Sequence, residues 1–266
     1  MSVSSTWNGA SWTAPVHFPR GLEAPEGKSL SCASPKFCAA LTLEPERGGQ
    51  SYATVWNGSQ WSPPTTVPFL DDVSCPSAGW CMATSLTSQS YEVYQRGRWV
   101  KSQFSEDIMG GAEAKCSSPS DCLAAGEPTL LWNGKSWKKG PPTPEADPDG
   151  LSCVGGMCMA VSMGTGGTGT PGPSSADLYN KGRWSKPVTI VPNGDMTTAL
   201  RDVSCATTTL CVAVTGDSSA YVWADRKWTT TQIPMQLSDM PVTLSCAPKL
   251  CIFNQAHGDT YKATLP

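Results

Sequence analysis

Three acidic residues recur at one position of a repeated pattern, three residues before the first cysteine of a cysteine pair. They are Asp72, Glu113 and Asp202, and the same position in the other repeats holds Ser29, Gly150 and Thr243. Carboxylates held close together can bind a cation or act as general acid and base, because like charges at short range raise one pKa. The alternative is that they are solvated carboxylates that cap the ends of strands, since acidic residues are common in turns.

Six pairs of cysteines account for all twelve cysteines of the chain, at Cys32/Cys38, Cys75/Cys81, Cys116/Cys122, Cys153/Cys158, Cys205/Cys211 and Cys246/Cys251. A tetrahedral zinc site needs four ligands, whereas each pair stands alone in its repeat and the chain has only 2 histidines. We therefore expect no metal site. The pairs predict disulfides within each repeat, and disulfides indicate an oxidising compartment.

Two aromatic residues five positions apart, around a turn such as Asn57-Gly58, follow each of the first five cysteine pairs and also stand at the start of the chain. Because Asn-Gly tolerates positive φ angles, the pattern predicts a tight hairpin with both rings diagonal on one face. One interpretation is packing between neighbouring repeats, since aromatic rings dominate such cores. The other is stacking on a ligand, for which the candidates, beside the three acidic residues, are Trp56, Trp61, Trp132, Trp137, Trp223 and Trp228. The remaining aromatic pairs are Trp7/Trp12, Tyr94/Trp99 and Tyr179/Trp184.

A repeat of about forty residues must position these groups, and repeats of this length that hold several short strand patterns are typical of propellers and solenoids. In the second repeat, alternation and β-branched or aromatic content predict four strands, over residues 72–75, 81–85, 91–94 and 98–103. The expected fold class is all-β, a six-bladed β-propeller with four-stranded antiparallel blades.

The two ends of the chain carry complementary parts of one repeat. The chain begins with an aromatic hairpin and ends with a cysteine pair, so residues 1–16 and 242–266 are expected to build a shared closing blade. Residues 260–265 would be its third strand and 11–16 its outermost strand. This predicts one domain over residues 1–266. The Gly-rich stretch 162–175 is expected to be a mobile flap.

Composition excludes several classes of function. A net charge of -3 and a pI near 5.4, without a basic cluster, argue against a nucleic-acid partner. No apolar run is long enough for membrane insertion, and no phosphate loop, nucleophile elbow or zinc-protease helix is present, so we expect no cofactor. Residues 1–10 have neither the basic nor the apolar segment of a signal peptide. For an extracellular protein we therefore expect that a leader was removed or that Met1 is an introduced start.

Two motifs carry a resemblance to a known group of proteins. S-C-P-S-x-x-x-C at 74–81 and W-N-G-x-x-W at 56–61 resemble the repeats of secreted actinobacterial proteins taken to be β-propellers, over essentially the whole chain. The resemblance implies a propeller fold and export. The six-fold architecture is also similar to that of fucose-binding propeller lectins, but their sugar-binding motifs do not match these residues.

Three functions are compatible with these patterns. The leading hypothesis is a secreted, lectin-like recognition module without catalysis, whose partner is a glycan or cell-surface polymer, because the chain is rich in Trp and poor in acid and base residues. The second is a hydrolase or lyase that uses the carboxylates at the channel mouth. The third is a protein-binding subunit of a larger exported assembly.

Overall fold

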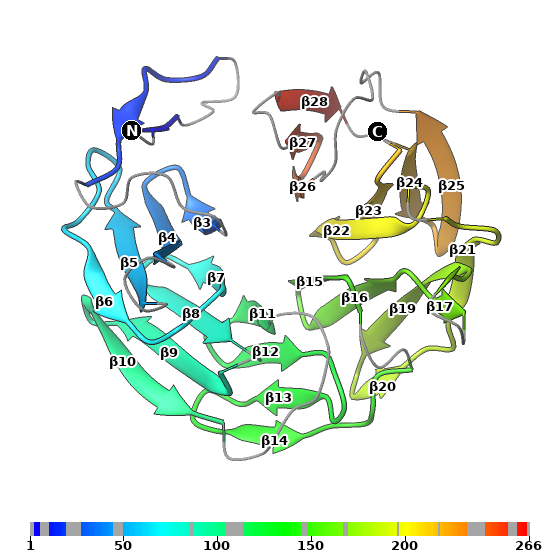
Figure 1. Cartoon of the computed structure of the whole chain (residues 1–266), viewed down its shortest axis with the longest axis horizontal. Helices are drawn as coiled ribbons and strands as arrows, with labels where there is room; N and C mark the ends of the chain where they lie inside the picture. The colour runs from blue at the N-terminus through cyan, green and yellow to red at the C-terminus, as the bar shows by residue number, and fades with distance from the viewer. Residues whose placement is uncertain are drawn as a thin grey trace. The chain divides into compact units, whose positions relative to one another are not determined.

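The computed structural model describes residues 3–5, 11–19, 28–44, 50–85, 88–104, 114–144, 148–166, 170–195, 197–217, 219–232, 243–254 and 260–264. This part of the chain is all-β, and its small antiparallel sheets have the topology of a six-bladed β-propeller (Figure 1). The predicted fold class is therefore confirmed. No helix long and apolar enough to cross a membrane occurs among these residues. The chain divides into two compact units, Met1–Asp107 with Glu113–Ser120, and Ile108–Ala112 with Asp121–Pro266.

The first unit contains blades 1 and 2, in which strand neighbours follow the order of the chain. Blade 1 consists of β3 (Lys28–Ser34), β4 (Phe37–Glu44), β5 (Gln50–Trp56) and β6 (Thr65–Val67). Blade 2 consists of β7 (Asp72–Ser77), β8 (Trp80–Ser85), β9 (Ser90–Gln95) and β10 (Arg98–Gln103). The unit also holds β11 (Ala114–Ser118) and a two-stranded sheet of β1 (Val3–Ser4) and β2 (Val16–His17).

The second unit begins with β12 (Asp121–Ala124), β13 (Leu130–Trp132) and β14 (Trp137–Lys139) of blade 3. Blade 4 has β15 (Gly150–Val154), β16 (Met157–Ser162), β19 (Ser174–Asn180), β20 (Arg183–Trp184) and β21 (Val188–Val191). Blade 5 has β22 (Leu200–Thr207), β23 (Leu210–Thr215), β24 (Ser219–Ala224) and β25 (Lys227–Gln232). Blade 6 shows β26 (Thr243–Ala247), β27 (Leu250–Asn254) and β28 (Thr260–Thr264).

Disulfides tie the first two strands of a blade together, as the spacing predicts. Cys32–Cys38, Cys75–Cys81, Cys153–Cys158, Cys205–Cys211 and Cys246–Cys251 are bonded, with Cα atoms 3.9 to 4.1 Å apart. Cys116 and Cys122 are also disulfide-bonded, so no cysteine is left as a thiol. The small ring that each bond closes is worth about 2 kcal/mol in the chain-entropy account. The oxidised cysteines correspond to an oxidising environment.

The turn between the third and fourth strands takes two forms. In the W-N-G copies only Gly58 and Gly134 have positive φ, and the Asn57 carboxamide oxygen accepts hydrogen bonds from the Ser59 and Gln60 amides at 2.9 and 3.0 Å. In the other copies both turn residues have positive φ, as at Arg96 and Gly97. The aromatic residues therefore stand directly opposite each other, as in the Trp132↔Trp137 and Trp223↔Trp228 pairs. The predicted diagonal placement is wrong. Four residues separate the two aromatic residues of each pair along the chain, and with this number the two residues lie directly opposite each other.

The core lies between neighbouring blades of a unit. Alanines in the second strand of the blades are almost inaccessible, since Ala39, Ala83 and Ala213 are each 0% exposed. In the first unit, residues of blade 1 pack against Val73, Cys75 and Cys81 of blade 2. In the second unit, Met157, Met159 and Val161 of blade 4 pack against Val203 and Trp223 of blade 5. Small side chains allow the sheets to approach closely, while the large ones fill the wider space outside.

The segments expected to close the ring are partly described. β28 pairs with β27, which confirms a third strand in blade 6. Val16 belongs to β2, which pairs with β1, rather than to a strand that begins at Ser11. The shared closing blade stays a prediction. The flap contains a short antiparallel pair, β17 (Thr165–Gly166) with β18 (Thr170–Pro171).

Candidate functional site

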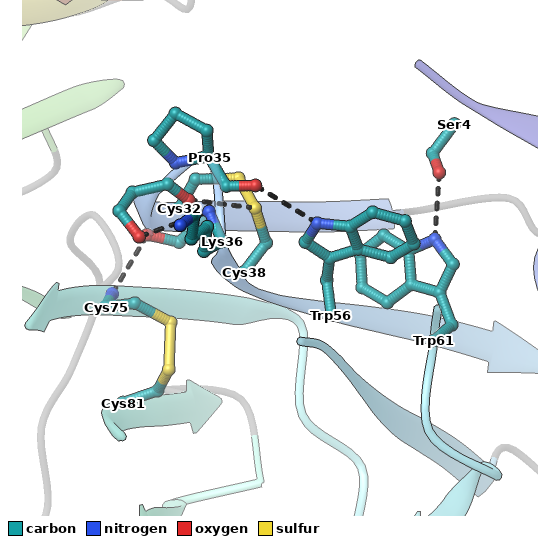
Figure 2. Close-up of a disulfide and its surroundings, with 11 residues drawn as sticks. Ser4, Cys32, Pro35, Lys36, Cys38, Trp56, Trp61, Cys75 and Cys81 are labelled. Carbon is teal, nitrogen blue, oxygen red and sulfur yellow. Dashed lines mark hydrogen bonds between the residues drawn. A yellow bond between two sulfur atoms is a disulfide. The ribbon is translucent and has the colours of Figure 1, made fainter. Parts of the chain in front are cut away.

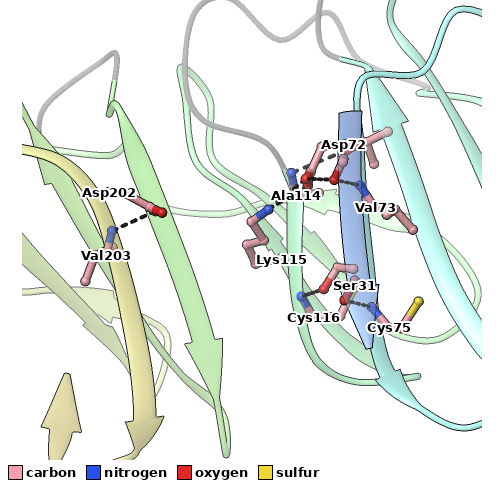
Figure 3. A network of polar contacts seen from close by, with 12 residues as sticks. Ser31, Asp72, Val73, Cys75, Ala114, Lys115, Cys116, Asp202 and Val203 are labelled. Atoms are coloured by element: carbon pink, nitrogen blue, oxygen red, sulfur yellow. Dashed lines mark hydrogen bonds and ion pairs between the residues drawn. The ribbon is translucent and has the colours of Figure 1, made fainter. Parts of the chain in front are cut away.

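Asp72, the best candidate among the acidic residues, lies in an ion-paired network of the first unit (Figure 3). Asp72 on β7 is 3% exposed, and the Lys115 ammonium group on β11 contacts both of its carboxylate oxygens at 2.8 and 2.9 Å. The Ser29 hydroxyl on β3 donates to the same carboxylate at 2.9 Å and accepts the Val73 amide at 3.0 Å. Asp72 thus connects the inner strands of three successive blades.

Asp202 makes a similar contact in the second unit. Its carboxylate accepts the Leu244 amide of β26 at 2.8 Å and the adjacent Val203 amide at 2.8 Å. The carboxylate therefore binds the backbone of the following blade, as the Ser29 hydroxyl does in blade 1. Glu113 lies outside the described residues.

A second set of hydrogen bonds explains the serine that precedes the first cysteine. In four cases its hydroxyl accepts the amide of the first cysteine of the next blade at 2.9 to 3.0 Å; the pairs are Ser31 with Cys75, Ser74 with Cys116, Ser152 with Cys205 and Ser204 with Cys246. We call these bonds the serine ladder. Sequence reasoning overlooked the ladder, although the recurrent Ser-Cys dipeptide was its signal. In blade 3 Lys115 replaces this serine and reaches Asp72.

Gly150 occupies the acidic position in blade 4 because a side chain does not fit there. A Cβ atom on Gly150 would lie 3.0 Å from the Cα atom of Asp202 and 3.2 Å from the Val203 amide nitrogen. β15 and β22 therefore approach each other closely at this point. Within the described part of the chain, no three potential metal ligands gather, and roles of Asp72 and Asp202 in ligand binding or catalysis stay predictions.

Most of the aromatic rings pack against neighbouring side chains and are not exposed to solvent. Trp56 and Trp132 are each 8% exposed, and their rings lie 5.6 Å from the rings of Trp61 and Trp137 at tilted angles. Trp137 and Trp223 are also buried, whereas Trp61 and Trp228 are half-buried. Packing therefore accounts for most of these rings, and their predicted stacking on a ligand stays untested.

The second tryptophan of blade 1 is covered by the N-terminal segment of the chain. Phe18 stacks on Trp61 with ring centroids 4.6 Å apart and an interplanar angle of 26°. The Trp61 indole donates to the Ser4 hydroxyl at 2.8 Å, and the Trp56 indole donates to the Pro35 carbonyl at 3.2 Å (Figure 2). In blade 4 the Trp184 indole likewise donates to the Thr129 hydroxyl at 3.2 Å.

The equivalent tryptophan of blade 5 lines an open groove in the second unit. The groove has a volume of about 690 Å³ and lies between blades 4 and 5, with Met157, Leu178 and Val188 on one side and Trp223 and Trp228 on the other. We call it the blade 4–5 groove. Among the described residues, the Trp228 indole donates no hydrogen bond, and its ring does not form the close pair seen in blades 1 to 4.

The outer strand of blade 4 is interrupted beside this groove. The Ser185 hydroxyl accepts the Leu178 amide at 3.0 Å and donates to the Lys186 carbonyl at 3.0 Å, which separates β20 from β21. β21 then pairs with the other end of β19, and Val188 is left 50% exposed in the groove wall. The only signal for this surface in the sequence is weak, namely the Ser-Lys-Pro interruption between two strand patterns.

Exposed basic residues lie next in sequence to residues that line the groove. Arg226 and Asp225 line it directly. Lys181 and Arg183 belong to the turn that follows the lining residue Asn180, and Lys186 and Lys227 follow Ser185 and Arg226. All six charged residues are exposed, five of them cations and one a carboxylate. These chain segments therefore carry an excess of positive charge, although the whole chain carries a net charge of -3.

No family model matches the chain, and no curated protein sequence matches it. Several solved structures resemble its fold. The structure titled "YCF48 bound to D1 peptide" aligns with a TM-score of 0.61 at 12% identity, over 88% of this chain and 76% of that one. The WD40 β-propeller domain of Doa1 gives 0.57 at 11% identity, over 91% and 94%. U3-55K gives 0.60 at 12% identity, over 85% and 72%. At these identities the likeness concerns the fold alone.

Proposed function

We propose that this protein is an exported recognition module that binds a peptide or protein segment. The observation that carries the proposal is the blade 4–5 groove, an open apolar surface with two tryptophans and with basic residues in the neighbouring chain segments. Its volume of about 690 Å³ lies in the range of ligand-binding pockets. The lining residues Met157, Met159 and Trp223 belong to the core between blades 4 and 5.

Similar propellers support this class of ligand. The structure titled "YCF48 bound to D1 peptide" shows a peptide complex on a related architecture. Because fold does not imply function, this likeness only makes peptide binding compatible with the fold, and the groove itself supplies the chemical argument.

The glycan hypothesis receives less support from the described residues. A saccharide site needs an accessible aromatic face with fixed polar groups around it. Trp56, Trp132 and Trp137 are buried against neighbouring side chains, and Trp61 is covered by Phe18. The hydrolase or lyase hypothesis also receives less support. Its main candidate for a catalytic carboxylate was Asp72, which binds Lys115 and Ser29. Glycan binding and catalysis remain outcomes that the experiment must separate.

The oxidised cysteines support the proposal that the protein is exported. Twelve disulfide-bonded cysteines in a chain of this size correspond to a secreted or cell-surface protein, because the cytosol keeps thiols reduced. The proposed place of action is therefore outside the cell.

An unbiased ligand screen tests the proposal. The disulfide-intact protein is applied in parallel to a phage-displayed peptide library and to a glycan array. We expect enrichment of peptides whose binding is confirmed by calorimetry with synthetic copies, without turnover of the bound peptide. Glycan binding without any peptide enrichment would favour the lectin hypothesis, and a chemically altered ligand would favour an enzyme.

A further inference from the structure

We propose that the blade 4–5 groove binds an extended peptide segment that carries an aromatic anchor between acidic residues. The inference rests on the proposed function and deepens it, because it names the chemistry of the partner and the side chains that recognise it. Two independent observations lead to it, one from blade 1 and one from the charged residues of the groove lining and the neighbouring chain segments.

The first observation is an occupied counterpart of the groove within the same chain. Trp61 pairs with Trp56 as Trp228 pairs with Trp223, so the two tryptophans hold equivalent places in their blades. On Trp61 the chain places its own Phe18, stacked at 4.6 Å, and its own Ser4 hydroxyl as acceptor for the indole N–H at 2.8 Å. A surface of this kind therefore accepts an aromatic ring together with an oxygen acceptor.

Blade 5 lacks this internal occupant among the described residues. No described aromatic ring stacks on Trp228, and no described acceptor meets its indole N–H. Buried or half-buried indole donors usually find an acceptor. The groove thus offers a donor and an apolar wall of Val188 and Leu178 for a ring supplied by another molecule.

The second observation is charge. Arg226 lines the groove together with Asp225, and the neighbouring chain segments add four exposed cations, Lys181, Arg183, Lys186 and Lys227. Exposed cations raise the association rate and select an acidic partner, and the effect weakens with salt. A peptide with carboxylates on both sides of the anchor therefore complements the groove.

The extended form of the peptide is inferred from the segment around Phe18, which covers Trp61 in blade 1. Phe18 precedes Pro19 and follows the short strand β2, and a residue before proline is confined to extended conformations. A matching probe is a fluorescein-labelled octapeptide with the central sequence Val-Asp-Phe-Pro between two glutamates on each side. Fluorescence anisotropy measures its affinity for the full chain with disulfides intact.

The expected results concern both partners. Replacing the peptide phenylalanine by alanine weakens binding at least about tenfold, because a buried aromatic ring contributes a large part of the affinity. Exchanging its carboxylates for amides weakens binding several-fold and removes most of the salt dependence. The indole N–H resonance of Trp228, assigned with Trp228→Phe, shifts when the peptide binds.

Matched variants locate the site. Val188→Glu places a carboxylate in the groove and abolishes binding, whereas Val100→Glu alters an exposed valine on β10 of the other unit and leaves binding unchanged. Arg226→Glu weakens binding at least about tenfold. Its control, Arg96→Glu, changes an arginine that also lies in a hairpin turn at positive φ.

Two outcomes overturn this inference without touching the broader proposal. If Val188→Glu and Val100→Glu bind the peptide equally, the site lies elsewhere. If the phenylalanine-to-alanine peptide binds as tightly as the parent, the aromatic anchor is wrong. Failure of the proposed function itself would be seen separately, as a peptide library that yields no ligand of any sequence.

Discussion

Removing the ammonium group that neutralises Asp72 should destabilise the protein more than removing the carboxylate itself. In Lys115→Met the carboxylate, whose side chain is only 4% exposed, stays buried beside Ser29 without this cation. In Asp72→Asn the carboxamide oxygen can still accept the Ser29 hydrogen bond, and Lys115, which is 25% exposed, can be hydrated. The asymmetry follows because an uncompensated charge costs more when water does not reach it.

The magnitude follows from the burial of each partner. Breaking a fully buried ion pair costs about 3 to 5 kcal/mol. Because Lys115 is a quarter exposed, we expect smaller costs than this, about 2 to 3 kcal/mol for Lys115→Met and about 1 kcal/mol for Asp72→Asn. In the double variant the two losses should not add, and the coupling should be about 1 kcal/mol or more.

Urea unfolding under non-reducing conditions, followed by tryptophan fluorescence, measures these differences. Lys138→Met, which removes an exposed lysine on β14, is the control and should change the free energy of unfolding by less than about 0.5 kcal/mol. The reasoning is refuted if Lys115→Met behaves like this control, or if Asp72→Asn is the more damaging of the two. A well-folded Asp72→Asn protein that has lost a measurable reaction would instead return Asp72 to the enzyme hypothesis.

Two further predictions address the serine ladder and a buried carboxylate. Ser74→Ala removes the acceptor of the buried Cys116 amide and should cost about 1 to 3 kcal/mol in urea unfolding, while Ser120→Ala in an exposed turn should cost almost nothing; equal effects would contradict a structural role for the ladder. Burial raises the pKa of the Glu92 carboxyl, and Lys101, which stands opposite it on β10, lowers that pKa in part. The folded state therefore holds the Glu92 proton more tightly than the unfolded state does, and wild-type stability should fall relative to Glu92→Gln as pH rises from about 4 to 7. Thermal unfolding at a series of pH values checks this, and a wild-type stability that rises relative to that of Glu92→Gln with increasing pH would contradict the sign.

The acidic position shows why a recurrent residue type does not reveal its role. Asp72, Asp202 and Ser29 all occur three residues before a cysteine, and each turns out to bond a neighbouring inner strand. From sequence alone the carboxylates were equally compatible with chemistry, because their partners Lys115 and Leu244 lie about forty residues further along the chain. A pairing at that separation depends on how two blades meet, and local patterns carry no information on it.

Features that arise within one repeat could be predicted from the amino-acid pattern. The spacing of Cys75 and Cys81 sufficed for the disulfide, and period-two alternation placed the strands of blade 2 within a few residues of β7 to β10. These features depend on covalent geometry and on hydrogen bonds between adjacent strands, which act over few residues. The contacts of the tryptophans, in contrast, could be seen only in the folded chain. Phe18 covers Trp61, while Trp228 borders a groove whose other wall is Leu178 and Val188, because side-chain packing between blades joins segments that are distant in the chain.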